Sequence, residues 1–251
     1  MKSWLAMTIT DDILKKAAKK KLHFSLLDPE DQTAEEAGKL AKIAENAGSS
    51  AMMVGGSTLA SSEEVDETVK AIKASSDLPV ILFPSGAKFL SKYADAIFFM
   101  SLLNSRNLGY VIREHVQGAP FIQKMGVEPI PMGYLIIEPG MTAGKMGQVD
   151  LIKRDDYPTA VGYGLATQFL GMKLFYIEAG SGAPEPAPNE MIAAVKKTID
   201  IPLVVGGGIR DAKTAREKTQ AGADIIVTGT TFEKDKNVEN TLREIIKAIE
   251  E

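Results

Sequence analysis

Short apolar runs alternate with longer amphipathic stretches along the whole chain. The runs are rich in Val, Ile, Phe and Tyr, and the stretches between them are rich in Ala, Glu and Lys with the spacing of helices. This alternation predicts βα units around a parallel sheet. We expect strands at Leu22–Leu27, Ala51–Val54, Val80–Phe83, Ala96–Met100, Tyr134–Glu138, Leu174–Glu178, Leu203–Val205 and Ile225–Val227.

The strand number and the chain length together favour an α/β fold, a single (β/α)₈ barrel of the TIM type over residues 1–251. An open doubly wound sheet is the alternative, but it would place its glycines after the first strand. Here the glycine clusters come late, at Gly206–Gly208 and at Gly229. Between Phe83 and Asp95 there is too little chain for a full crossover helix, so we expect the third helix to be shortened or missing.

Several residues mark the ends of predicted helices. Thr33 with Glu36 three residues later predicts a capping box, and Gly48 should end that helix. Asp211 should begin another helix. The segment 139–147 contains three glycines, which predicts the least regular part of the interior.

Composition narrows the function classes. A net charge of -4 gives no long-range attraction for nucleic acid, and the absence of cysteine excludes disulfides and thiolate chemistry. The first residues are too quickly polar for a signal peptide, so we expect a cytoplasmic protein. The basic segment 15–21 could touch an anionic lipid surface, but we favour the solvated end of a helix, which leaves at most peripheral membrane contact.

Two late loops have the residues of a phosphate site. Gly206–Arg210 follows the seventh predicted strand and Thr228–Thr231 follows the eighth. Small residues let backbone N–H groups approach a phosphate, and barrels of this type bind phosphate monoesters at these strands. The alternative is that the glycines only form tight turns, but two such loops on adjacent strands favour phosphate binding.

A carboxylate stands beside this predicted phosphate site. Tyr176 and Glu178 share one face of the sixth strand, and Ser181 with its flanking glycines continues the phosphate site. Glu178 would point at the polar group next to the phosphate, for which a hydroxyl is the natural partner. An ion pair with a neighbouring lysine is the alternative role.

A second carboxylate, Asp28, follows the first strand, and Gly55–Thr58 follows the second. A carboxylate and a hydroxyl at adjacent strand ends suit Mg²⁺, although Asp-Pro is also a common turn before a helix. The strand ends at 98–100 and 134–137 are apolar and could line an opening for a hydrocarbon chain, but ordinary core is the favoured interpretation. The histidines His23 and His115 have no metal spacing and receive no role.

Taken together, these motifs resemble those of the geranylgeranylglyceryl phosphate synthase family, of the archaeal type, with bacterial heptaprenylglyceryl phosphate synthases as relatives. The resemblance covers nearly the whole chain. It rests on Leu27–Pro29, Val54–Thr58, Leu103–Asn107, Gly133–Pro139, Tyr176–Gly182, Val205–Ile209 and Thr228–Thr230.

The resemblance implies a Mg²⁺-dependent prenyltransferase with Mg²⁺ on Asp28 and Ser57. It also implies a homo-oligomer, dimer or hexamer, and a barrel that lacks its third helix. In one branch of the family a lysine stands two residues before the aspartate; here that position is Leu26. The residues implied to bind glycerol-1-phosphate are Tyr176, Ile177, Glu178, Ala179, Gly180, Ser181, Gly182, Gly207, Gly208, Gly229 and Thr230.

The hypothesis is therefore transfer of a prenyl group, geranylgeranyl by default, from its diphosphate to the free terminal hydroxyl of sn-glycerol-1-phosphate in archaeal lipid synthesis. Glu178 would take the hydroxyl proton and Asp28 would hold the metal beside the diphosphate. The segment 139–147, which contains Lys145, would be a lid over the diphosphate. The alternatives are a phosphosugar isomerase or aldolase barrel, and a non-catalytic phosphoglycerol-binding protein.

Overall fold

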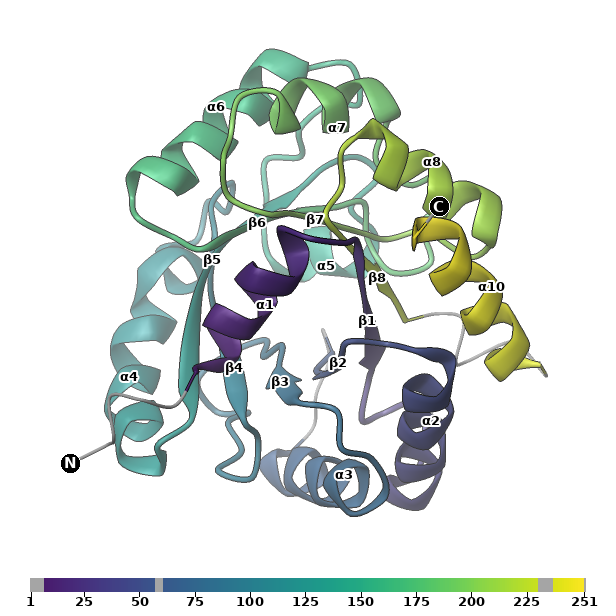
Figure 1. The fold of residues 1–251 in the computed structure, drawn as a ribbon. Helices are drawn as coiled ribbons and strands as arrows, with labels where there is room; N and C mark the ends of the chain where they lie inside the picture. Colours follow the sequence, from purple (N-terminus) through teal and green to yellow (C-terminus); the bar gives the residue numbers. More distant parts are fainter. Residues whose placement is uncertain (1–6, 57–60, 230–236, 251) are drawn as a thin grey trace.

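Eight parallel strands form a closed barrel at the centre of the molecule (Figure 1). The structure, a computed structural model, describes residues 7–56, 61–229 and 237–250. Each strand pairs with the next in sequence, and β8 pairs with β1, so the predicted (β/α)₈ barrel is confirmed. The strands are β1 (Leu22–Leu27), β2 (Ala51–Val54), β3 (Val80–Leu82), β4 (Ala96–Leu102), β5 (Glu128–Ile136), β6 (Leu174–Glu178), β7 (Leu203–Gly206) and β8 (Ile225–Thr228).

Helices surround this barrel (Figure 1). Aliphatic side chains on the outer face of the strands pack against them, and this layer forms most of the core. The helices are α1 (Ile9–Ala17), α2 (Ala34–Ala47), α3 (Ser62–Ser75), the π-helix η1 (Gly109–Arg113), α4 (Glu114–Met125), α5 (Met141–Met146), α6 (Tyr157–Phe169), α7 (Asn189–Lys196), α8 (Ala212–Ala221) and α10 (Val238–Glu250).

The connection between β3 and β4 has no helix. Residues 83–95 form turns and bends only, which confirms the prediction that the third crossover helix is missing. The other strand-to-strand connections within the described residues each contain a helix of the outer layer. The connection between β3 and β4 therefore provides no helix to cover the barrel at these two strands.

One predicted strand was placed wrongly. The structure begins β5 at Glu128, whereas the sequence predicted a strand from Tyr134 to Glu138. Pro129 and Pro131 lie in β5 and pair with Ile97 and Phe99 of β4. Proline has no N–H and argues against a strand, so the pattern hid the first half of β5.

The helix ends follow the predicted residues. Thr33 and Glu36 form a capping box at α2, and Gly48 ends it with a φ of 100° that favours glycine. Asp211 accepts a hydrogen bond from the Thr214 N–H at the start of α8.

The segment 139–147 is not irregular, contrary to the prediction, because it contains α5. Its glycines are needed because neighbouring atoms leave little room for a side chain. A Cβ at Gly144 would lie 3.2 Å from Leu151, and one at Gly147 would lie 2.9 Å from the Ala143 carbonyl oxygen.

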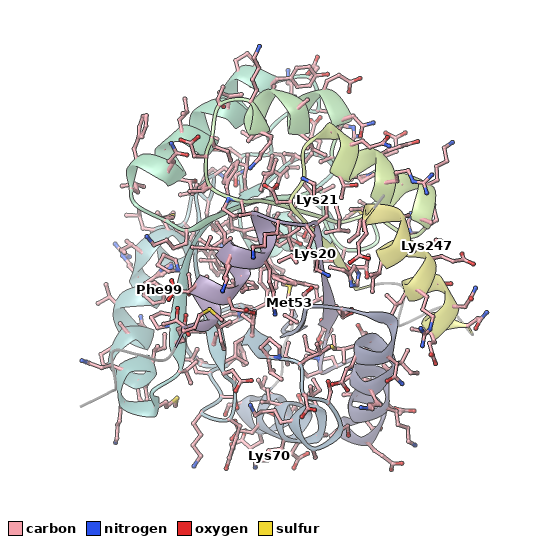
Figure 2. The ribbon with its side chains drawn as sticks, viewed as in Figure 1. Lys20, Lys21, Met53, Lys70, Phe99 and Lys247 are labelled. Carbon is pink, nitrogen blue, oxygen red and sulfur yellow. The ribbon has the colours of Figure 1, made fainter. Side chains whose placement is uncertain are left out.

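The end of the barrel at the strand N-termini is closed by α1, which lies across it in Figure 1. Ile13 packs into the interior cluster, and the Glu128 carboxylate accepts hydrogen bonds from the Ile9 and Thr10 N–H groups, both at 2.8 Å. An acidic group at a helix N-terminus is favoured by the helix dipole. In Figure 2, Met53 lies within the barrel, whereas Lys70 and Lys247 lie outside the helical layer. A ligand must therefore enter from the opposite end.

Within the described residues, no helix is both long and apolar enough to pass through a bilayer.

Candidate active site

A cavity of about 560 Å³ opens at the C-terminal ends of the strands. Such ends carry the functional residues of (β/α)₈ barrels. One part of the cavity lies at the barrel mouth, where Asp28, Glu178, Ser181 and Gly229 contribute to its wall. The other part extends along β4 and α4 and is apolar, with walls formed by Leu90, Ile97, Phe98, Phe99, Met100 and Ile122.

Glu178 is the last residue of β6, and its side chain is only 6% exposed. The Tyr176 hydroxyl donates a hydrogen bond to Glu178 Oε2 at 2.5 Å, and the Gly180 N–H donates to Oε1 at 2.8 Å. Burial raises the pKa of the carboxyl, and these two hydrogen bonds oppose the rise. Each oxygen retains a second lone pair, so the carboxylate can still accept a proton.

Aromatic side chains hold Glu178 in position. Burial, followed by the charge of Glu178, raises the pKa of Tyr176 well above its usual value, so this phenol remains a proton donor. Its ring packs against Tyr134 and Phe83, with centroids 5.2 Å and 5.9 Å away. This packing restricts Tyr176 to one orientation and therefore fixes Glu178 as well.

Two glycine loops lie next to Glu178. Gly180 and Gly182 after β6, and Gly207 and Gly208 after β7, all have positive φ. A Cβ at Gly207 would overlap the Glu178 carboxylate, so the loop after β7 can lie beside it only with glycine there. Within the described part of the chain, the N–H groups of Gly207 and Gly208 donate to no other group. They are free to bind an anion.

Asp28 lies on the other side of the mouth, directly after β1. Burial raises the pKa of its carboxyl to about 6, the Glu30 N–H opposes the rise, and the charges of Asp31 and Glu30 add to it. A Cβ at Gly56 would overlap this carboxylate, so the loop after β2 contacts Asp28 closely. No group of three or more His, Cys, Asp or Glu side chains that could hold a metal occurs in the described residues.

The described wall of the cavity is acidic. Four carboxylates line it, those of Asp28, Asp31, Glu114 and Glu178, and the wall residues that the structure describes include no Lys or Arg. A strongly anionic ligand would therefore need cations from elsewhere to enter this cavity.

The chain as a whole matches one family model. The model describes the PcrB family and covers residues 14–249. This chain belongs to the PcrB family.

Two similar relatives of this PcrB-family chain have the same name. Geranylgeranylglyceryl phosphate synthase of Thermococcus gammatolerans is 55% identical over 233 residues, 93% of this chain and 92% of the relative. The protein of the same name from Picrophilus torridus is 47% identical over 243 residues, 97% and 100% of the two chains.

A solved structure with the same enzyme name is also similar to this chain. (S)-3-O-geranylgeranylglyceryl phosphate synthase from Thermoplasma acidophilum, crystallised with its substrate sn-glycerol-1-phosphate, is similar at a TM-score of 0.95 and 47% identity, covering 98% of this chain and 99% of that one. A thiamine phosphate pyrophosphorylase from Pyrococcus furiosus, at a TM-score of 0.58 and 14% identity over 91% and 95% of the chains, shares the fold alone.

The PcrB-family structure brings together only some of the predicted site residues. Glu178, Ser181 and Gly229 lie on the cavity wall. The remaining glycines lie in the two loops next to Glu178: Gly180, Gly182, Gly207 and Gly208. The side chains of Ile177 and Ala179 instead pack in the outer core, so they could reach a ligand only through their backbone. The predicted residues Ser57 and Thr230 lie outside the described residues.

The sequence pattern favoured ordinary core over an apolar opening at residues that line the apolar part of the cavity in this PcrB-family protein. Phe99, interpreted as core, lines it and packs edge-on against His115 of α4, with ring centroids 4.5 Å apart. Burial lowers the pKa of His115, which favours the neutral form of its ring.

The second histidine has a structural role. His23 is buried, with Nδ1 2.8 Å from Ser49 Oγ and Nε2 2.9 Å from Thr228 Oγ1.

Proposed function

We propose that this chain transfers a geranylgeranyl group from its diphosphate to the terminal hydroxyl of sn-glycerol-1-phosphate, as an enzyme of archaeal lipid synthesis in the cytoplasm. The observation that carries the proposal is the position of Glu178, a buried carboxylate between anion-binding glycine loops and a long apolar cavity. The glycine loops suit a phosphorylated acceptor, and the apolar part of the cavity suits a prenyl chain.

In the reaction, the glycine loops orient the acceptor so that its free hydroxyl lies next to Glu178. Glu178 takes the hydroxyl proton, and the oxygen forms a bond to the first carbon of the prenyl chain. The bond between this carbon and the diphosphate oxygen breaks, and diphosphate leaves with the bonding electrons. Tyr176 holds Glu178 in place through its 2.5 Å hydrogen bond. The aromatic wall excludes water from the reacting carbon.

We propose Mg²⁺ as the cofactor. Its proposed ligands are Asp28, which lies in the described part of the chain, and Ser57, which lies outside it. The described residues fit this ion: Asp28 is a partly desolvated carboxylate with a raised pKa, and the cavity wall is acidic without Lys or Arg. Mg²⁺ uses few protein ligands and takes the rest from substrate phosphates and water. When bound, it would neutralise charge on the departing diphosphate.

The experiment that tests the function uses the purified chain with prenyl diphosphates of several lengths, Mg²⁺, and either sn-glycerol-1-phosphate or its mirror image sn-glycerol-3-phosphate. We expect a geranylgeranyl ether of the first acceptor, detected by mass. Isomerisation or cleavage of a phosphosugar without a prenyl donor would instead support the isomerase or aldolase alternative. Binding of the acceptor without any product would support the binding-protein alternative.

Gly229 offers a test of the phosphate site without steric damage. A Cβ there would lie 3.5 Å from Leu26, an ordinary contact, so Gly229→Ala should fold normally. We expect the KM for sn-glycerol-1-phosphate to rise several-fold while the KM for the donor stays unchanged, because a methyl group narrows the approach to the backbone. Gly162→Ala, at an open position of α6, is the matched control. An equal rise in both KM values would contradict a phosphate role for Gly229.

We also propose that the chain forms a homo-oligomer, either a dimer or a hexamer, through the outer face of η1 and α4. Leu108, Ile112 and Val116, spaced four residues apart, are all more than half exposed there. An exposed apolar stripe of this kind marks an interaction surface. We expect Val116→Asp to lower the sedimentation coefficient toward that of a monomer, and the neighbouring Gln117→Asp to leave it unchanged. A monomeric wild-type chain would contradict this proposal, and loss of a vesicle-bound fraction in Val116→Asp would indicate membrane contact instead.

A further inference from the structure

The loop that follows β6 is held from two sides by arginines. Arg210, in the loop after β7, donates from Nη2 to the Gly182 carbonyl at 2.9 Å and to the Ala183 carbonyl at 2.6 Å. Arg154, from the connection after β5, donates from Nη2 to the Pro186 carbonyl at 2.8 Å. Both arginines therefore bind backbone oxygen atoms of the segment directly after Ser181.

The sequence of this segment explains why it needs such donors. Prolines occupy positions 184, 186 and 188, so every second residue lacks an N–H and has a fixed φ. The segment cannot join a helix or a strand ladder, and its carbonyl groups need other donors. Charged donors such as guanidinium groups form the stronger hydrogen bonds.

The loops after β6 and β7 meet backbone to backbone. A Cβ at Gly207 would lie 2.7 Å from the Gly180 nitrogen, and a Cβ at Gly208 would lie 3.0 Å from the Ala183 carbonyl oxygen. Glycine is required for this approach, but glycine has no side chain with which to fix it. Among the described residues, Arg210 is the side chain whose hydrogen bonds join one loop to the other.

We propose that Arg210 is a positioning residue for the phosphorylated acceptor: it holds the loop after β6 against the loop after β7, so that their N–H groups face one phosphate. This inference rests on the proposed function. Arg210 acts on the acceptor side of the mouth only, because Asp28 and the apolar part of the cavity belong to β1, β4 and α4. The Arg154 contact remains in an Arg210 variant and keeps the far end of the loop in place.

The test compares Arg210→Gln, Arg210→Lys and a control by steady-state kinetics. In Arg210→Gln we expect the KM for sn-glycerol-1-phosphate to rise by about 10-fold, because two charge-assisted hydrogen bonds are lost. The KM for geranylgeranyl diphosphate and the kcat should stay unchanged. Arg210→Lys should recover most of the acceptor affinity, since one ammonium group can donate to both carbonyls. The matched control is Arg243→Gln, which removes an exposed ion pair with Glu239 on α10.

Two results would overturn the proposal: an unchanged acceptor KM in Arg210→Gln, or a parallel loss of acceptor affinity, donor affinity and melting temperature that lysine does not repair. Calorimetric binding of sn-glycerol-1-phosphate alone keeps the test independent of turnover. If the wild-type chain makes no ether product, the proposed function fails. A weaker calorimetric affinity in Arg210→Gln would then still support the positioning role, and an equal affinity would overturn it.

Discussion

Glu178→Gln is expected to lower kcat by about 10² to 10⁴, the usual contribution of a positioned general base. The amide can keep both local hydrogen bonds, because its oxygen can accept from the Gly180 N–H while its NH₂ group donates to the Tyr176 oxygen. Both substrates should therefore bind as in the wild type. The measurements are single-turnover rates at saturating substrates and calorimetric binding of each substrate.

The pH profile gives a second test of the same group. Burial raises the pKa of Glu178, and a protonated carboxyl cannot take the hydroxyl proton, so kcat should fall as pH decreases through this raised pKa. Tyr176→Phe removes a hydrogen bond that lowers the pKa, and should move the acidic limb to higher pH. Near-full turnover in Glu178→Gln would show that this carboxylate only orients the acceptor.

Asp28→Asn is expected to remove the Mg²⁺ dependence of donor binding while sn-glycerol-1-phosphate still binds. The amide has nearly the same size but lacks the charge that holds the ion. In the wild type, protons compete with the metal for a carboxyl whose pKa is about 6. The apparent Mg²⁺ affinity should therefore increase as pH rises through about 6 and level off above it. Calorimetry of a prenyl diphosphate with and without Mg²⁺, at several pH values, measures both effects.

Asp31→Asn is the matched control on the same wall of the cavity. Its charge contributes to the raised pKa of Asp28, so its removal should move the midpoint of the Mg²⁺ profile to lower pH and keep the metal dependence. Unchanged Mg²⁺-dependent donor binding in Asp28→Asn would mean that the ion binds elsewhere.

Local sequence signals predicted the fold well where one residue type determines one geometry. The strands β1, β2 and β6 begin and end at the predicted residues, since each is an apolar run between polar turns. The prediction failed where proline or glycine serves packing. Pro129 and Pro131 lie inside β5, and Gly144 of α5 allows close contact with Leu151.

The candidate site divides in the same way. The glycine loops and the two carboxylates could be predicted, because strand ends of a barrel converge at one mouth. The contribution of α4 could not, since it depends on where a distant helix packs. Pairwise contacts such as that between Arg210 and Ala183 also depend on tertiary structure, and no spacing in the sequence indicates them.

The barrel has two halves with different roles, and the half that lacks a helix between β3 and β4 is the apolar one. In the proposed reaction, proton transfer and anion binding belong to β6, β7 and β8, whereas the half formed by β3, β4 and α4 provides the apolar space. Phe83 packs against Tyr176 and must keep its size, but residues of β4 and α4 that line the far part of the cavity can change in size with little effect on Glu178. A barrel built in this way can adjust the length of its hydrocarbon product independently of the chemistry that makes the ether bond.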